Sequence, residues 1–184
     1  WILKEFKGLQ KDVADHYDSY SYHLVVQRIH NFCVNQLGGI YLDIIKDRQY
    51  TTQKNSQIRR SAQTVMKLMV DQLVMLVSPI LSFTAEEIWQ NDEQLSSEIA
   101  SVFLAELSSI PDFSCNLDHG DWKRLLEIKD SVNQKIEESR NSGEIKGSLD
   151  TDIELTVSSA DFEILHNLSA ELHFFFIVSS CKLI

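Results

Sequence analysis

Residues 41–64 read YLDIIKDRQYTTQKNSQIRRSAQT, and the rest of the chain is organised around this stretch. The residues on both sides of its polar centre follow helical spacing, so it predicts the end of one helix, a short turn and the start of the next. Residues 46–67 contain one anion, Asp47, and six cations, in a chain whose formal net charge is -10. We therefore expect a basic corner between two helices of an acidic protein. The six cations are Lys46, Arg48, Lys54, Arg59, Arg60 and Lys67.

Two of these cations occupy an unfavourable position for positive charge. If Ser56 is the N-cap, Arg59 and Arg60 lie in the first turn of the next helix, where a cation costs about 0.3 to 1 kcal/mol. Helix N-termini with nearby arginines suit phosphate, so the arrangement indicates an anion site. The alternative is that both arginines are solvated or paired with Asp43 or Asp47.

The composition is that of an ordinary globular domain. The 184 residues are 43% apolar and 24% charged, without an apolar run long enough to span a membrane. Cys33, Cys115 and Cys181 are odd in number and widely separated, which argues against a disulfide framework or a zinc site and fits a reducing, cytoplasmic location. We also expect the chain to be part of a longer protein.

The charges are segregated along the chain. Residues 68–121 contain no Lys or Arg but ten acidic residues. Acidic proteins generally bind nucleic acid poorly, because affinity comes largely from cations that meet phosphates. The segregation nevertheless allows an RNA to be steered to the basic corner alone.

Apolar periodicity predicts a mostly α-helical fold. Gly38 and Gly39 would allow a neighbouring helix to approach closely, or else bend their own helix. Trp89 is expected in the core, and residues 91–121 are expected to be mainly loop. The predicted helices cover residues 1–17, 19 or 21 to about 45, 56–78, a short segment that begins with a capping box at residues 84–87, and 121–140.

After residue 148 the apolar period changes to two. This predicts strands at residues 153–157 and 174–178 around a helix at 161–168, which together form a small βαβ-like appendage. Two strands make a poor sheet, so the appendage either packs on the bundle or continues beyond residue 184. We expect two domains, a helical bundle at 1–147 and a truncated α/β appendage at 148–184.

No catalytic or metal site is predicted. His16, His23 and His30 recur every seven residues, but that spacing places neighbours about 10.5 Å apart along a helix, too far to share one ion. Glycine-rich phosphate loops and nucleophile elbows are absent from the sequence.

Several motifs carry a resemblance to a known family. YLDIIKDRQYT and RRSAQT, followed by PILSFTAEEIW at 79–89, VFLAEL at 102–107 and LLEIKDSVNQKIEESR at 125–140, resemble the anticodon-binding helical domain of bacterial isoleucyl-tRNA synthetases. The resemblance implies a helical bundle that binds the anticodon stem-loop of tRNA. It also implies a monomeric parent that joins isoleucine to tRNA with ATP, with a zinc-binding tail in many members. The fragment itself would hold neither cofactor nor catalytic site. The alternatives are the equivalent domain of a valine or leucine enzyme, or a helical protein-interaction module.

We expect the RNA contacts to lie at the basic corner. The ring of Tyr50 would stack on a base; alternatively, this ring closes the end of the bundle. Gln49 would form a hydrogen bond with a base edge. The alternative role for Lys46 and Arg48 is structural: positive charge in the last turn of the long helix interacts favourably with the helix dipole. Second-rank candidates are Arg28, Lys129 and Arg140. The first-rank residues are Arg48, Gln49, Tyr50, Lys54, Arg59, Arg60 and Lys67.

Overall fold

The computed structural model describes residues 1–111 and 113–184, which fold into two compact units, Trp1–Asp112 and Phe113–Ile184. This division differs from the expected boundary after residue 147. The helix α7 (His119–Asn141) packs against α8 (Ser159–His166) and α9 (Leu172–Phe176), and therefore belongs to the C-terminal unit.

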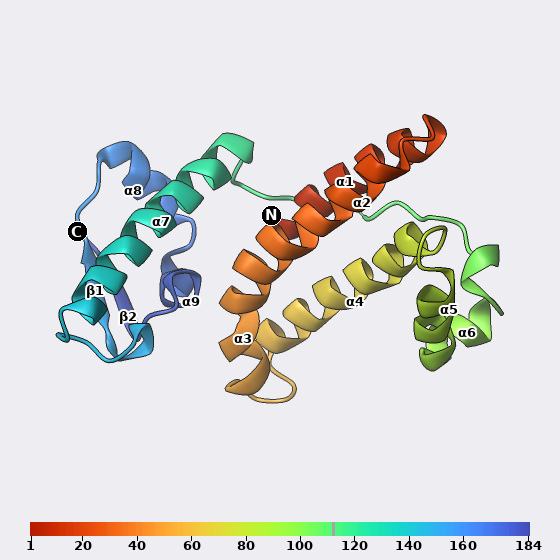
Figure 1. Cartoon of the computed structure of the whole chain (residues 1–184). Coiled ribbons are helices and arrows are strands. Elements are labelled where there is room, and N and C mark those ends of the chain that lie inside the picture. The colour runs from red at the N-terminus through yellow and green to blue at the C-terminus, as the bar shows by residue number, and fades with distance from the viewer. Residues whose placement is uncertain (112) are drawn as a thin grey trace. The chain divides into compact units, whose positions relative to one another are not determined.

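The first unit is built of helices (Figure 1). The hairpin of α1 and α2 is antiparallel, and α4 returns along the rod that α2, η1 and α3 form together. This confirms the helices expected at 1–17 and 56–78, and extends the long rod to Tyr50. The elements are α1 (Ile2–Asp18), α2 (Tyr22–Asn31), the π-helical segment η1 (Phe32–Leu42), α3 (Asp43–Tyr50), α4 (Gln57–Val77), α5 (Ser82–Asn91), α6 (Glu93–Glu98) and the 3-10 turn η2 (Val102–Leu104).

The wide turns of η1 explain the paired glycines. A Cβ on Gly38 would lie 3.0 Å from the carbonyl oxygen of Cys33, and one on Gly39 would lie 3.1 Å from that of Val34. Each carbonyl belongs to the residue five positions earlier, the one that a π-helical turn brings close. The glycines therefore make room for their own helix, which is neither the close helix approach nor the bend that the sequence suggested.

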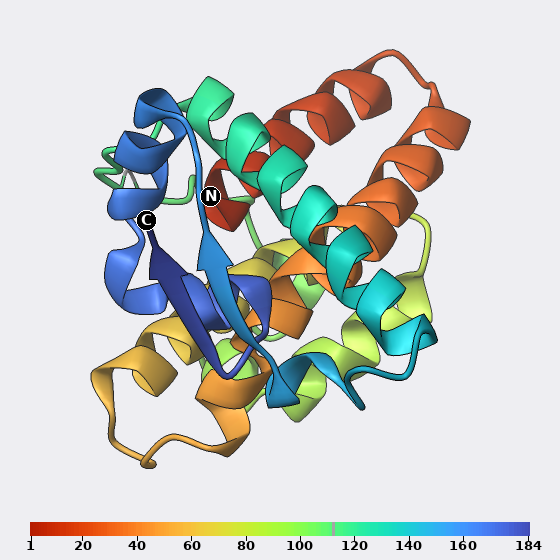
Figure 2. The same cartoon turned by 90° about the vertical axis from the view of Figure 1, so that its left-hand side faces the viewer.

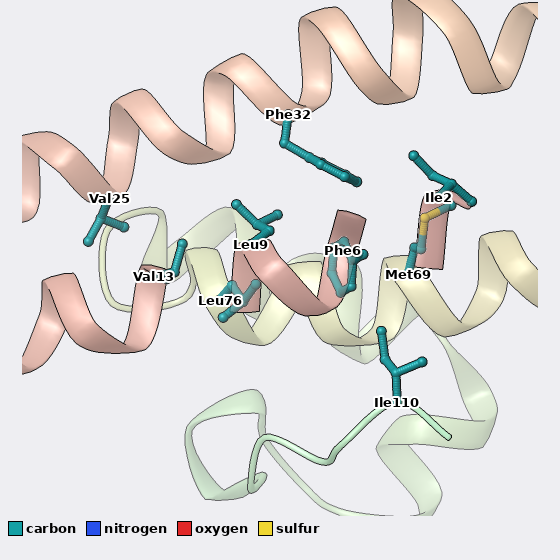
Figure 3. Close-up of a cluster of buried hydrophobic side chains, with 9 residues drawn as sticks. All are labelled: Ile2, Phe6, Leu9, Val13, Val25, Phe32, Met69, Leu76 and Ile110. Carbon is teal, nitrogen blue, oxygen red and sulfur yellow. The ribbon is translucent and has the colours of Figure 1, made fainter. Parts of the chain in front are cut away.

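Apolar side chains of α1, the long rod and α4 form the main core (Figure 3). The rings of Phe6 and Phe32 meet edge to face with centroids 5.4 Å apart. Fully burying such a side chain stabilises the fold by about 1.5–3 kcal/mol. This core fixes the rod and α4 side by side, and so places the end of α3 next to the start of α4. Its buried members are Ile2, Phe6, Leu9, Val13, Val25, Phe32, Met69, Leu76 and Ile110.

A smaller core surrounds Trp89, which is 2% exposed. Its indole nitrogen donates a hydrogen bond of 2.8 Å to the carbonyl of Ile99, which confirms a core role. The expected capping box at residues 84–87 is wrong, because α5 already begins at Ser82. Glu86 instead accepts hydrogen bonds from the Ser101 hydroxyl at 2.8 Å and from the backbone of Val102 at 3.0 Å.

The second unit contains α7 and a two-stranded parallel sheet (Figure 2). Strand β1 (Asp152–Leu155) pairs with β2 (Ser180–Leu183), with Ile153 opposite Cys181, so a βαβ-like unit is confirmed. The remaining elements are the 3-10 turns η3 (Ser148–Asp150) and η4 (Ser169–Glu171), together with α8 and α9.

The strand expected at residues 174–178 is wrong. Residues 174–176 complete α9, and the helix ends where Ile177 adopts the left-handed region with φ 58°. Residues 174–178 are apolar without interruption, and such a run fits a strand and a buried helix equally well. The helix and its cap are favoured because they bury Phe175, Phe176 and Val178.

Candidate functional site

The basic corner is the junction of α3 with α4, held in shape by side-chain hydrogen bonds to the backbone. The hydroxyls of Thr51 and Thr52 donate to the carbonyls of Asp47 and Arg48, each at 2.6 Å. The Ser56 hydroxyl donates to Thr52 Oγ1 at 3.1 Å. We use the name basic corner for Lys46, Arg48, Gln49, Tyr50, Lys54, Arg59 and Arg60.

Ser56 is the N-cap of α4, as expected. It has extended φ/ψ of -65° and 144°, and its hydroxyl accepts from the backbone nitrogen of Arg59 at 3.3 Å. Arg59 and Arg60 therefore lie in the first turn of α4, which carries no acidic residue. The positive end of the helix and two arginines combine there into one electropositive surface.

Four side chains of the corner are open to solvent. Tyr50 is 82% exposed, so its ring does not close the end of the bundle. Lys46, Lys54 and Arg60 are exposed, and within residues 1–111 and 113–184 none of them forms an ion pair with a carboxylate. The pairing of arginines with Asp43 or Asp47 that the sequence allowed is thus not observed for Arg60.

The other three side chains of the corner are half-buried. Arg59 Nη1 donates to the carbonyl of Thr52 at 3.5 Å, which turns the guanidinium toward the loop. Arg48 lies close to Tyr41. Burial raises the pKa of the Tyr41 phenol to about 12, although the positive charge of Arg48 acts to lower it. Gln49 and Arg59 both line a hollow of about 480 Å³ between α3 and α4. The sequence does not reveal this hollow, because its apolar wall follows the same spacing as a packed helix face.

Lys67 differs from the corner residues because its charge is compensated. Its Nζ lies 2.6 Å from Asp71 Oδ1 and 2.9 Å from Asp92 Oδ2, at the N-cap of α6. Partial burial acts to lower the pKa of Lys67, but the hydrogen bonds and charges of the two aspartates outweigh it and raise that pKa. Lys67 thus connects α4 to α6, a link between segments distant in sequence that no sequence pattern indicated.

The second-rank cations are also engaged. Arg28 Nε lies 2.8 Å from Asp12 Oδ2, and Arg140 Nη1 lies 3.3 Å from Glu137 Oε1. Lys129 is 6% exposed and donates to the carbonyl of Phe175 at 2.5 Å, so it is unavailable to a ligand.

The charges of the first unit are separated along α4. Its 21 residues span about 32 Å, with the basic corner at the N-terminal end and the acidic α5 after the C-terminal end. An anionic partner is therefore attracted to one end of the unit and repelled from the other.

Two further structural features are absent from the described part of the chain. No helix there is both long and apolar enough to cross a membrane. Nor do three or more His, Cys, Asp or Glu side chains come together there in a way that could hold a metal ion.

Comparisons with known proteins give a consistent result. Residues 1–155 match the family described as the anticodon-binding domain of tRNA ligase. The chain is 43% identical to an isoleucine–tRNA ligase of Teredinibacter turnerae, over 100% of the chain and 20% of that protein. It is 42% identical to that of Legionella pneumophila strain Lens, over 99% of the chain and 19% of the protein. It is 40% identical to the isoleucine–tRNA ligase of Saccharophagus degradans, over 100% of the chain and 20% of that protein. The chain thus spans about one fifth of the length of these relatives.

Proposed function

The chain belongs to the anticodon-binding domains of tRNA ligases, and from this premise we propose that it binds the anticodon stem-loop of a tRNA within an isoleucine–tRNA ligase. The observation that carries the proposal is the basic corner. There, exposed cations that form no ion pair with a carboxylate of the described residues lie close to the N-terminus of α4, and an exposed tyrosine ends α3.

Six of the seven residues of the basic corner have a chemical role in this proposal. Lys54 and Arg60 contact phosphates, because they are exposed and lie on the electropositive end of α4. Tyr50 offers a flat ring to an unstacked base, the usual way in which proteins read single-stranded RNA loops. The half-buried residues contact the anticodon loop from the inner side of the corner; they are Arg48, Gln49 and Arg59. Lys67 is omitted, because two aspartates already compensate its charge.

The mechanism assigned to these residues is positioning and discrimination. We propose that the parent protein joins isoleucine to its tRNA using ATP at a site outside these 184 residues, as a cytoplasmic monomer. Relatives named isoleucine–tRNA ligase support that choice over the valine and leucine enzymes and over a protein-interaction module.

A binding titration tests the proposal. Fluorescence anisotropy would compare the isoleucine anticodon stem-loop with the same stem carrying a scrambled loop, and with valine and leucine stem-loops. We expect the isoleucine loop to bind most tightly. Equal affinity for intact and scrambled loops would contradict anticodon recognition, and preference for valine or leucine loops would assign the chain to a sister enzyme.

A further inference from the structure

Three large apolar side chains at the start of α5 and in η2 are open to solvent. Phe83 is 94% exposed, Leu104 is 71% exposed and Phe103 is 57% exposed. Together they expose roughly 400 Å² of surface, taking about 200 Å² for a fully exposed side chain of this size. Single exposed apolar residues are ordinary in folded proteins, whereas a contiguous group of this area marks a contact surface.

Hydrogen bonds between α5 and the segment after α6 show that these side chains are neighbours. Gln90 Nε2 donates to the carbonyl of Ala100 at 2.6 Å. One turn earlier in α5, Glu86 accepts from the backbone nitrogen of Val102 at 3.0 Å. The segment therefore runs antiparallel to α5, and its next two residues reach the level of Phe83, a further turn toward the start of the helix. We use the name apolar patch for Phe83, Phe103 and Leu104.

The charge around the apolar patch excludes two occupants. The patch lies within residues 68–121, which contain ten acidic residues and no Lys or Arg, and Glu87 and Glu106 are exposed beside it. Such a surface repels the phosphates of an RNA. A symmetric pair of copies would bring two identical acidic surfaces face to face, which is also unfavourable. The occupant that fits is a protein surface with an apolar centre and Lys or Arg side chains around it.

The size of the apolar patch indicates where that protein surface belongs. A stable interface between separate proteins buries about 800 Å² on each partner, about twice the area of the patch. A surface of the same polypeptide needs less area, because a short connection holds it at an effective concentration in the millimolar range. The relatives are about five times as long as this chain, so a parent of that length has the surface to supply.

We propose that the apolar patch docks onto another part of the parent protein, on a surface that is apolar at its centre and basic at its rim. This inference rests on the proposed isoleucine–tRNA ligase parent, but it does not depend on anticodon binding. The 21 residues of α4, about 32 Å in length, separate the patch from the basic corner. Docking therefore holds one end of the unit against the parent and leaves the other end free for RNA.

Hydrogen exchange tests the docking in the parent protein, with the 184-residue chain as the reference. We expect the amides of residues 82–104 to exchange on the order of tenfold to a hundredfold more slowly in the parent. The docked surfaces must separate before these amides exchange, and burial of one aromatic side chain changes an equilibrium constant by about that factor.

Phe83→Ser is the test variant, and Val26→Ser is the matched control. Each replaces an exposed apolar side chain of a helix by serine, and Val26 lies on α2, outside the apolar patch. In the 184-residue chain both should leave the thermal midpoint nearly unchanged, because little buried area is lost. In the parent, Phe83→Ser should return residues 82–104 to the exchange rate of the 184-residue chain, whereas Val26→Ser should not. Phe103→Ser is a second variant that keeps the test valid if Phe83→Ser unfolds.

Three results would overturn the docking. The first is equal exchange of residues 82–104 in the parent and in the 184-residue chain, or a slowing that persists in both Phe83→Ser and Phe103→Ser. The second is a dimer of the 184-residue chain in sedimentation that Phe83→Ser abolishes, which would assign the patch to a second copy. The third is loss of stem-loop binding in Phe83→Ser with an unchanged thermal midpoint, which would assign the patch to RNA.

Failure of the proposed function is a separate result. If the 184-residue chain binds intact and scrambled stem-loops equally, while residues 82–104 exchange slowly only in the parent and Phe83→Ser removes that slowing, anticodon recognition fails and the docking stands.

Discussion

The double substitution Lys54→Ala with Arg60→Ala tests the basic corner most directly. Both side chains are exposed and form no ion pair with a carboxylate in the part of the chain that the structure describes, so the substitutions remove charge without breaking an ion pair seen there. Each phosphate contact contributes about 0.7 to 0.9 to the slope of log affinity against log salt. Losing two contacts should reduce that slope by about 1.4 to 1.8. Between 50 and 200 mM salt, the variant should therefore lose roughly 7- to 12-fold less affinity than the wild type.

Stability should move in the opposite direction from binding. Arg60 lies in the first turn of α4, where a cation costs about 0.3–1 kcal/mol, so its removal should leave the thermal midpoint unchanged or slightly raise it. Weaker binding together with undiminished stability identifies a residue that serves the ligand.

The assay is an anisotropy titration with the anticodon stem-loop at several salt concentrations, alongside thermal unfolding. Lys11→Ala with Lys123→Ala is the matched control, because it removes the same charge from exposed positions outside the corner. An unchanged slope in the corner variant, or an equal reduction in the control, would refute a localised phosphate contact. A large drop in the thermal midpoint would show that the corner cations are structural.

Four other substitutions probe the architecture of the first unit. Lys67→Met should slightly lower the thermal midpoint at pH 7 and leave the salt slope of RNA binding unchanged. In the wild type, the hydrogen bond from Lys67 lowers the pKa of Asp92. The wild type should therefore be more stable than the variant above about pH 4, and this difference should disappear as the pH falls through the lowered pKa. An altered salt slope would contradict a purely structural role of Lys67. Gly38→Ala should destabilise the fold by about 1–3 kcal/mol through collision with the preceding π-helical turn, whereas Gly8→Ala, which has open space, should stabilise α1 by about 0.5–1 kcal/mol in chemical denaturation. Tyr20→Gly should stabilise the protein by up to about 1 kcal/mol, because Tyr20 is exposed and has φ 56°; a lower midpoint would show that its ring contacts matter more.

The sequence alone determined the helical class and the place of the corner. Apolar residues three and four apart specify which face of a helix is buried, and Ser56 before RRSAQT specifies where α4 starts. These are local signals, carried by neighbouring residues of one element. The motifs of residues 41–64 and 79–89 likewise pointed to the correct family.

Local sequence signals were insufficient where the same residues fit two kinds of secondary structure, or where a helix could belong to either unit. Residues 174–178 are apolar throughout, and only packing in the second unit decides that residues 174–176 belong to α9 and that Ile177 ends it. The helix α7 has the pattern of any bundle helix, and only its contacts assign it to the second unit.

For the site, the sequence determined which residue types gather, whereas the tertiary structure decided which of them remain available. Lys67 and Lys54 are equivalent in a charge pattern, yet Asp92, brought to α4 by the fold, compensates only Lys67. Gln49 and Arg59 belong to different helices, and their shared hollow exists only where α3 and α4 meet. Availability depends on distances between segments remote in sequence, and periodicity along one chain contains no information about those distances.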